Sequence, residues 1–176
     1  MFMSRSNCGI CLLALALALA MVGASWAQAS KPISKDHAIL YQRAVGFLDQ
    51  AEQKLKAGDL TAAKAQVKQS NALFTLLQKE YASRLAEREL SPQEDEQLAI
   101  NQKLANDTHA QADGLMATAA AQEKKAQELE AQGREADSKA SYRQSRDGYN
   151  QAQNLYVKSE LYSLRNQQRI FRFLAP

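Results

Sequence analysis

The sequence predicts an all-α protein. Its three prolines stand at positions 32, 92 and 176, where none interrupts a helix interior. The segments between them are rich in Ala, Gln, Glu, Lys and Leu, which favour helices, and they contain no run of alternating β-branched residues. We therefore expect four long helices that form two antiparallel hairpins in an elongated bundle, at residues 35–57, 60–90, 92–132 and 134–170 of the helical domain 35–170.

The N-terminal segment is typical of a signal peptide. A basic residue precedes an apolar run from Ile10 to Ala24, and small residues follow it. The small-x-small pattern places cleavage after Ala27 or Ala29, so residues 1–27 are the predicted signal peptide and residues 28–34 an N-terminal tail. An uncleaved anchor is disfavoured, because the apolar run is shorter than the roughly 20 residues that a spanning helix needs. We expect an exported bacterial protein, periplasmic or secreted.

Cleavage changes the composition in two ways. It removes both cysteines, so the predicted mature chain has no thiol and no disulfide. Of the 22 basic residues only Arg5 lies in the removed segment, which leaves 21 against 19 acidic residues. This near-equality of basic and acidic residues argues against nucleic-acid binding, because that function needs a basic face. We expect no nucleic-acid partner.

Residues typical of helix ends separate the predicted helices. Gly58 provides a stop and Asp59 a new N-cap. The sequence Ser-Pro-Gln-Glu at residues 91–94 has the pattern of a capping box with proline at the first helical position. Gly133 is the predicted boundary between the last two helices. No good cap follows it, so a single bent helix is the alternative there.

Tyrosines recur at every seventh residue of the last predicted helix, at Tyr142, Tyr149 and Tyr156. Such spacing places the three rings in line on one side of a helix. A shift of 75 residues aligns two similar segments and sets these tyrosines on apolar positions of the second helix, Val67, Phe74 and Tyr81. We interpret the tyrosines as part of a packing seam with the hydroxyls at its edge. The functional alternative is an aromatic strip that binds a glycan or a peptide.

The segment Gly-Asp-Leu-Thr-Ala-Ala-Lys-Ala-Gln-Val-Lys-Gln-Ser at residues 58–70 places a glycine turn before alternating large and small side chains. It resembles the turn and second-helix entry of tetratricopeptide hairpins over about a dozen residues. The later segment keeps Gly133, Ser138, Tyr142 and Ser145 at matching positions. The resemblance implies a TPR-like hairpin stack that binds proteins, with no catalytic residues to carry over.

Residues suited to catalysis or metal binding are scarce after the signal segment. His37 and His109 are the only histidines, and His109 shares a helical face with Asp113, which amounts to half a metal site at most. The sequence contains no Cys-x-x-Cys-His, Glu-x-x-His or Gly-x-Ser-x-Gly motif. We therefore expect no enzyme activity, no metal and no cofactor. A small-ligand bundle, with His37, His109 or the tyrosines lining a pocket, is an alternative.

The C-terminal segment combines arginines with apolar side chains. Its spacing places three arginines on one helical face beside an apolar stripe. Residues 171–176 are the predicted apolar and basic tail, which either docks on the bundle or meets a partner or a membrane surface. The predicted partner-binding residues are Arg165, Arg169, Ile170, Phe171, Arg172, Phe173 and Leu174.

These observations predict an exported, non-enzymatic helical scaffold or adaptor that mediates protein–protein interaction in the cell envelope. Its expected partners are envelope or secreted proteins. A periplasmic holdase or assembly chaperone, which would hold apolar client segments between the hairpins, is the alternative.

Overall fold

The computed structural model describes residues 35–175, and this part of the chain is helical without any strand. The elements are α2 (Lys35–Lys56), α3 (Leu60–Glu80), α4 (Ala82–Ala86), α5 (Pro92–Ala131), α6 (Glu135–Ile170) and the short 3-10 helix η1 (Arg172–Leu174). The all-α prediction is confirmed. The predicted signal peptide 1–27 and the tail 28–34 lie outside the described residues.

Most helix ends follow from the local sequence. Gly58 and Gly133 adopt φ angles of 77° and 72°, a left-handed conformation that glycine adopts without steric cost after a helix. Asp59 caps α3 by accepting a hydrogen bond from the amide of Ala62 at 3.0 Å. The capping box predicted at residues 91–94 is present at the start of α5. Gly133 is therefore a turn between α5 and α6 rather than a bend within one helix.

The helix predicted at residues 60–90 is interrupted at Tyr81, which separates α3 from α4. Tyr81 has φ of −110° and ψ of 17°, outside helical geometry. Its ring is buried against Phe173, with 5.6 Å between the ring centroids. Its hydroxyl is hydrogen-bonded to Nδ1 of His37 at 2.7 Å. These contacts join residues far apart in the chain, which explains why local propensity did not indicate the break.

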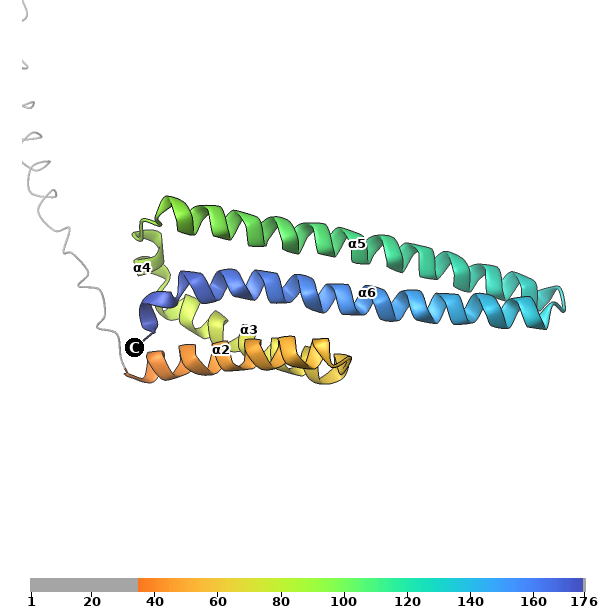
Figure 1. Ribbon diagram of the computed structural model, residues 1–176, viewed down its shortest axis with the longest axis horizontal. Coiled ribbons are helices and arrows are strands. Elements are labelled where there is room, and N and C mark those ends of the chain that lie inside the picture. The colour runs from red at the N-terminus through yellow and green to blue at the C-terminus, as the bar shows by residue number, and fades with distance from the viewer. Residues whose placement is uncertain (1–34, 176) are drawn as a thin grey trace, which may run out of the picture. The chain divides into compact units, whose positions relative to one another are not determined.

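The helices lie side by side in three rows (Figure 1). The helices α5 and α6 run in opposite directions along their whole lengths, and α2 and α3 pack against each other and against α6. The helices α2 and α3 cover only the C-terminal half of α6. The limit lies near Gln153, whose side-chain oxygen accepts a 3.0 Å hydrogen bond from Nζ of Lys64, near the start of α3. We call residues 110–154, which extend beyond this point, the arm.

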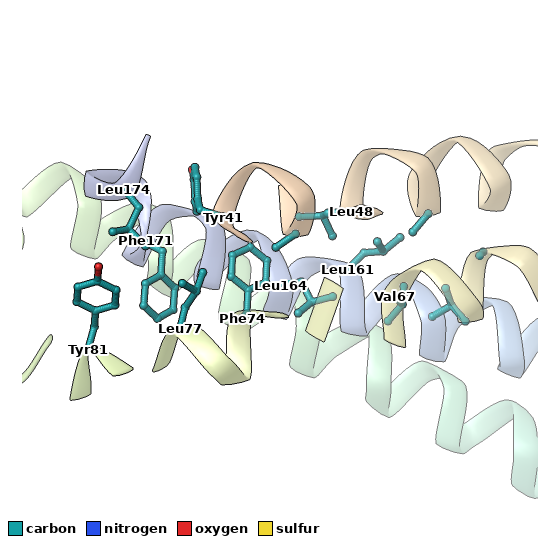
Figure 2. Close-up of a cluster of buried hydrophobic side chains, with 14 residues drawn as sticks. Tyr41, Leu48, Val67, Phe74, Leu77, Tyr81, Leu161, Leu164, Phe171 and Leu174 are labelled. Carbon is teal, nitrogen blue, oxygen red and sulfur yellow. The ribbon is translucent and has the colours of Figure 1, made fainter. Parts of the chain in front are cut away.

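Large apolar side chains gather where α2, α3, α6 and η1 meet (Figure 2). Phe74 and Phe171 stack there with 6.1 Å between their ring centroids. Both are fully buried, as are Leu48 and Leu77. The buried members of this core cluster are Tyr41, Ala44, Leu48, Ala51, Ala63, Val67, Phe74, Leu77, Tyr81, Val157, Leu161, Leu164, Phe171 and Leu174.

The contact between α5 and α6 is made of small side chains at seven-residue intervals. On α5 the buried positions include Ala105, Ala112, Ala119 and Ala126, and on α6 they include Ser138, Ser145, Ala152 and Ser159. A seven-residue repeat keeps one face of each helix turned to its partner. Small residues let the two backbones approach closely, and a Cβ added at Gly148 would lie 3.0 Å from the Cβ of Ala119. The seam therefore requires small residues.

Candidate functional site

Three tyrosines of α6, Tyr142, Tyr149 and Tyr156, lie along the edge of this seam and bond to α5. The Tyr142 hydroxyl donates to Oε2 of Glu130 at 2.9 Å, and the Tyr149 hydroxyl donates to Oε2 of Glu123 at 2.8 Å. The Tyr156 hydroxyl donates to Oδ1 of Asp113 at 2.6 Å. Each hydroxyl is therefore bonded within the chain, and the rings are only partly exposed, with Tyr142 the most exposed at 36%.

These bonds change the proton affinity of the tyrosines. A carboxylate that accepts a hydrogen bond from a phenol favours the neutral form of the phenol. The hydrogen bonds to Glu130, Glu123 and Asp113 are accordingly the largest cause that raises the pKa values of the three hydroxyls above their ordinary value. The sequence indicated the line of tyrosines but not its acidic partners. Glu123 and Glu130 are seven residues apart, as Tyr142 and Tyr149 are, and this matched spacing is a signal that could have found two of the partners. Asp113 lies ten residues before Glu123 and does not follow it.

A cleft opens where α3 diverges from α5 and α6. Its volume is about 620 Å³, and it is lined by apolar residues and by Lys64, Lys68, His109, Tyr156 and Glu160. The rings of His109 and Tyr156 meet edge to face with 5.0 Å between their centroids. This fork cleft therefore brings together His109 and one of the tyrosines that the sequence named as pocket candidates.

The histidines lie apart from any three-ligand group. Nε2 of His109 is 3.9 Å from Oδ1 of Asp113, and 59% of the His109 side chain is exposed. His37 lies at the opposite end of the core cluster, bonded to Tyr81. Between residues 35 and 175, no three His, Cys, Asp or Glu side chains come together as a metal site requires.

The C-terminal residues fold back on the core. Phe171 and Leu174 are 0% and 1% exposed and belong to the core cluster. Their side chains are buried within the chain, and the predicted partner contact of the C-terminal residues stays a prediction. Phe173 is half-buried, with the guanidinium of Arg84 4.8 Å from its ring centroid and that of Arg88 at 5.7 Å.

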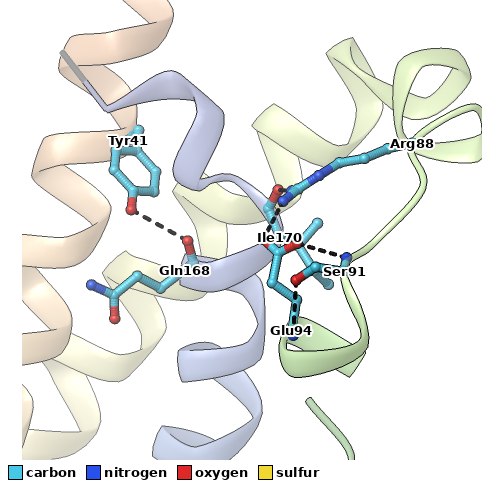
Figure 3. A network of polar contacts seen from close by, with 6 residues as sticks. All are labelled: Tyr41, Arg88, Ser91, Glu94, Gln168 and Ile170. Carbon is cyan, nitrogen blue, oxygen red and sulfur yellow. Dashed lines mark hydrogen bonds and ion pairs between the residues drawn. The ribbon is translucent and has the colours of Figure 1, made fainter. Parts of the chain in front are cut away.

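A polar network fastens the end of α6 to its neighbours (Figure 3). Arg88 donates to the carbonyl of Ile170 and to the carboxylate of Glu94, whose other oxygen accepts from the backbone amide of Ser91. On the opposite side, the Tyr41 hydroxyl donates to the carbonyl of Gln168 at 3.3 Å. The backbone hydrogen bond from Ser91 is the largest cause that lowers the pKa of Glu94, and the Ser91 hydroxyl and the charges of Arg88 and Arg172 lower it further. Sequence reasoning missed Arg88, since its partners are not local.

The three arginines predicted to share a face differ in their partners. Arg165 donates to Asp49 and Glu52 of α2, with 2.9 Å from its Nη2 to each carboxylate. Arg169 donates to the side-chain oxygen of Gln97 at 3.3 Å. Arg172 is exposed, and its side chain has no hydrogen bond or ion pair with any residue from 35 to 175. Arg165 therefore connects α6 to α2, whereas Arg169 and Arg172 have no acidic partner among residues 35–175.

A cavity of about 490 Å³ lies beside these arginines, between α2, α5 and the end of α6. Its lining includes Tyr41, Asn101, Arg165, Gln168, Arg169 and Arg172. We call it the arginine cavity. Among residues 35–175, no Asp or Glu lines it.

No protein family, curated protein or solved structure matches the chain in comparisons of sequence and structure. No helix between residues 35 and 175 is both long enough and apolar enough to span a bilayer. Proposals about function therefore rest on the residues and geometry described above.

Proposed function

We propose that the protein is an exported, non-enzymatic scaffold or adaptor of the bacterial cell envelope, in which two antiparallel hairpins have different tasks. The hairpin α2–α3 anchors the end of α6, and the arm of the hairpin α5–α6 meets another protein. The expected partner is an envelope or secreted protein that offers a polar, helical surface.

One observation carries this proposal: apart from the bond between Gln153 and Lys64 at its base, the arm packs against no other helix of residues 35–175. Toward the turn at Gly133, α5 and α6 extend past the ends of α2 and α3, and no other helix of the described part of the chain covers them there (Figure 1). Within the arm, small side chains close the seam and hydroxyl–carboxylate bonds follow its edge. An arm stabilised in this way can stay extended while both outer faces remain accessible.

The outer faces of the arm indicate the chemistry of the partner. Lys124, Lys125, Arg143 and Arg146 are exposed there together with Asp147. Mixed charges in an exposed interface steer association and set its register, and they weaken with salt. We therefore expect partner binding that falls as ionic strength rises.

A shortened arm tests the proposal. Deleting residues 113–126 and 141–154 removes two seven-residue repeats from each helix and preserves the register of the remaining seam. The turn at Gly133 stays, and Tyr156 then occupies the place of Tyr142 opposite Glu130. The core cluster contains no residue of either deleted segment.

The measurement is crosslinking and affinity capture from envelope extracts, with the full protein and the shortened arm compared at equal amounts. Partners captured by the full protein and lost with the shortened arm support the proposal. Circular dichroism and urea unfolding check that the variant is folded. If the two proteins capture the same partners, the arm is not the binding surface and the proposal fails.

Small-ligand binding in the fork cleft is a second candidate function, because the cleft is lined by His109 and Tyr156 and has a volume within the range of small-molecule sites. Native mass spectrometry of the purified protein provides the test. A bound mass that is lost in His109→Ala and kept in His37→Ala supports it. The unliganded mass alone, from protein purified without denaturation, contradicts it.

A further inference from the structure

The arginine cavity has more positive charge than its surroundings neutralise. Two carboxylates, Asp49 and Glu52, already neutralise Arg165. Arg169 is bonded to the neutral side chain of Gln97, and Arg172 to nothing between residues 35 and 175. Two guanidinium charges at this cavity therefore have no acidic partner in the described chain.

Glu94, whose carboxylate is affected by the charge of Arg172, is bonded to other groups. Arg172 lowers the pKa of Glu94, although it is the last of several causes. The Glu94 carboxylate is bonded to Arg88 at 2.7 Å and to the Ser91 amide at 3.0 Å. Because Glu94 closes the capping box of α5, it is held in place there and does not line the cavity.

Neutral donors complete the lining. The Gln168 side-chain oxygen accepts from Arg165 at 2.7 Å, which leaves its amide NH2 as the free end of that side chain. The Tyr41 hydroxyl donates to the Gln168 carbonyl, which fixes α2 against α6 at the cavity. The Asn101 side chain has no hydrogen bond with any residue from 35 to 175. Unused donors therefore outnumber unused anionic acceptors at this place.

We propose that the arginine cavity binds a phosphate monoester, with Arg169 and Arg172 as its charged ligands. A guanidinium group matches the oxygens of phosphate with paired N–H donors. A phosphate monoester carries about −1.5 to −2 charge at pH 7, which matches two unpaired arginines better than a single carboxylate does. A cavity of about 490 Å³ has room for the phosphate and for part of the group that it esterifies.

The phosphate has two chemical sources, a soluble sugar phosphate or the headgroup of a phosphorylated lipid. The test measures both with the purified full protein. Isothermal titration calorimetry with glucose 6-phosphate measures binding of a soluble phosphate, and titration with unphosphorylated glucose gives its baseline. Flotation with vesicles that contain phosphatidic acid measures binding of a lipid headgroup, and neutral phosphatidylcholine vesicles give its baseline.

Charge-neutral variants connect the binding to the cavity. Arg172→Gln removes a side chain with no structural bond between residues 35 and 175, so the fold should be retained, and circular dichroism checks this. We expect it to weaken binding about tenfold, and we expect Arg169→Gln to do the same. Arg43→Gln, which removes an exposed arginine of α2 that does not line the cavity, is the matched control and should leave binding unchanged.

Binding of either probe that is weakened by Arg172→Gln and kept in Arg43→Gln supports the site, and the probe that binds identifies the source. If neither glucose 6-phosphate nor phosphatidic acid vesicles bind, the proposal is wrong. It is also wrong if Arg43→Gln weakens binding as much as Arg172→Gln does, because net charge alone would then explain the effect.

Discussion

Two regions of the molecule keep their helices together with different side chains. One is the end that holds the core cluster, and the other is the arm. The core cluster buries Phe74, Phe171 and Leu77, whereas the buried arm positions are alanines and serines with the single exception of Leu129. Burying a large apolar side chain contributes about 1.5–3 kcal/mol, and burying one CH2 group about 0.8 kcal/mol. The core therefore holds most of the stability, and the arm depends more on helix propensity, close approach and edge bonds.

The two similar segments make the same difference visible residue by residue. Val67 and Phe74 of α3 are buried at the centre of the core cluster. Tyr142 and Tyr149, aligned with them after the 75-residue shift, lie at the edge of the arm seam. The same seven-residue spacing thus gives buried core positions on α3, which packs against both α2 and α6. It gives a hydrogen-bonded edge on the arm of α6, which packs against α5 alone among the described helices.

The largest expected effect comes from the core. Phe171→Ala removes a fully buried ring that stacks on Phe74, and should lower the free energy of unfolding by about 3–5 kcal/mol. Urea unfolding followed by circular dichroism measures it. Phe47→Ala removes a half-buried ring outside the core cluster and serves as the control. Equal losses in the two variants would contradict the assignment of the core.

Gly148 offers the matching disruption of the arm. A leucine there must force its Cβ against Ala119, so Gly148→Leu should cost about 1–3 kcal/mol by separating the helices. Gly114→Leu is the control, since a Cβ at Gly114 meets nothing within 4 Å, and its better helix propensity should stabilise slightly. Urea unfolding and hydrogen exchange of arm peptides measure both. A neutral Gly148→Leu would show that the helices are not closely packed.

The connection between the two regions depends on the cap of α5. Ser91→Ala removes the side-chain acceptor for the Glu94 amide and should cost about 1 kcal/mol. Ser83→Ala, on an exposed position of α4, is the control. Thermal unfolding of the two variants in parallel is the measurement, and an equal change in both would remove the cap from the account.

This cap also has a predicted pH dependence. The Ser91 backbone hydrogen bond lowers the pKa of Glu94 in the folded state. A lowered folded-state pKa contributes stability that is present above the ordinary value of about 4.5 and is lost as pH falls below it. Glu94→Gln should therefore flatten the acid limb of the stability profile, and an unchanged limb would speak against the cap.

The smallest expected effect concerns the edge of the arm. The bond to Glu123 raises the pKa of Tyr149, so its stabilising contribution is present below pH about 10 and is lost as pH rises through the raised value. A tyrosinate absorbance titration of the protein, minus that of Tyr149→Phe, isolates this hydroxyl. Glu123→Gln should bring the pKa back toward that of a free tyrosine. The account of the edge is wrong if Glu123→Gln leaves the titration of Tyr149 in place.

Local sequence determined much of the fold. The capping box at residues 91–94 and the glycine turns at Gly58 and Gly133 were predictable, because each depends on residues within one or two helical turns. The break at Tyr81 was not, because contacts with His37 and Phe173 produce it. Helix propensity indicates nothing about contacts between distant segments.

The candidate site follows the same rule. Spacing placed Arg165, Arg169 and Arg172 on one helical face, but only the packing of α2 against α6 shows that Asp49 neutralises the first of them. The burial of Phe171 is likewise a property of three assembled helices. The sequence therefore indicated where charged and aromatic groups lie along a helix, while the structure distinguishes those that hold the chain together from those left for a ligand.

Native-state hydrogen exchange, resolved by segment, tests the division into core and arm most directly. The account predicts that amides in α2, α3 and the last turns of α6 exchange only through global unfolding. Amides of residues 112–152 should exchange through local opening at lower free energy, with the difference greatest toward Gly133. Equal protection along the whole of α6, or stronger protection in the arm than in α3, would contradict it.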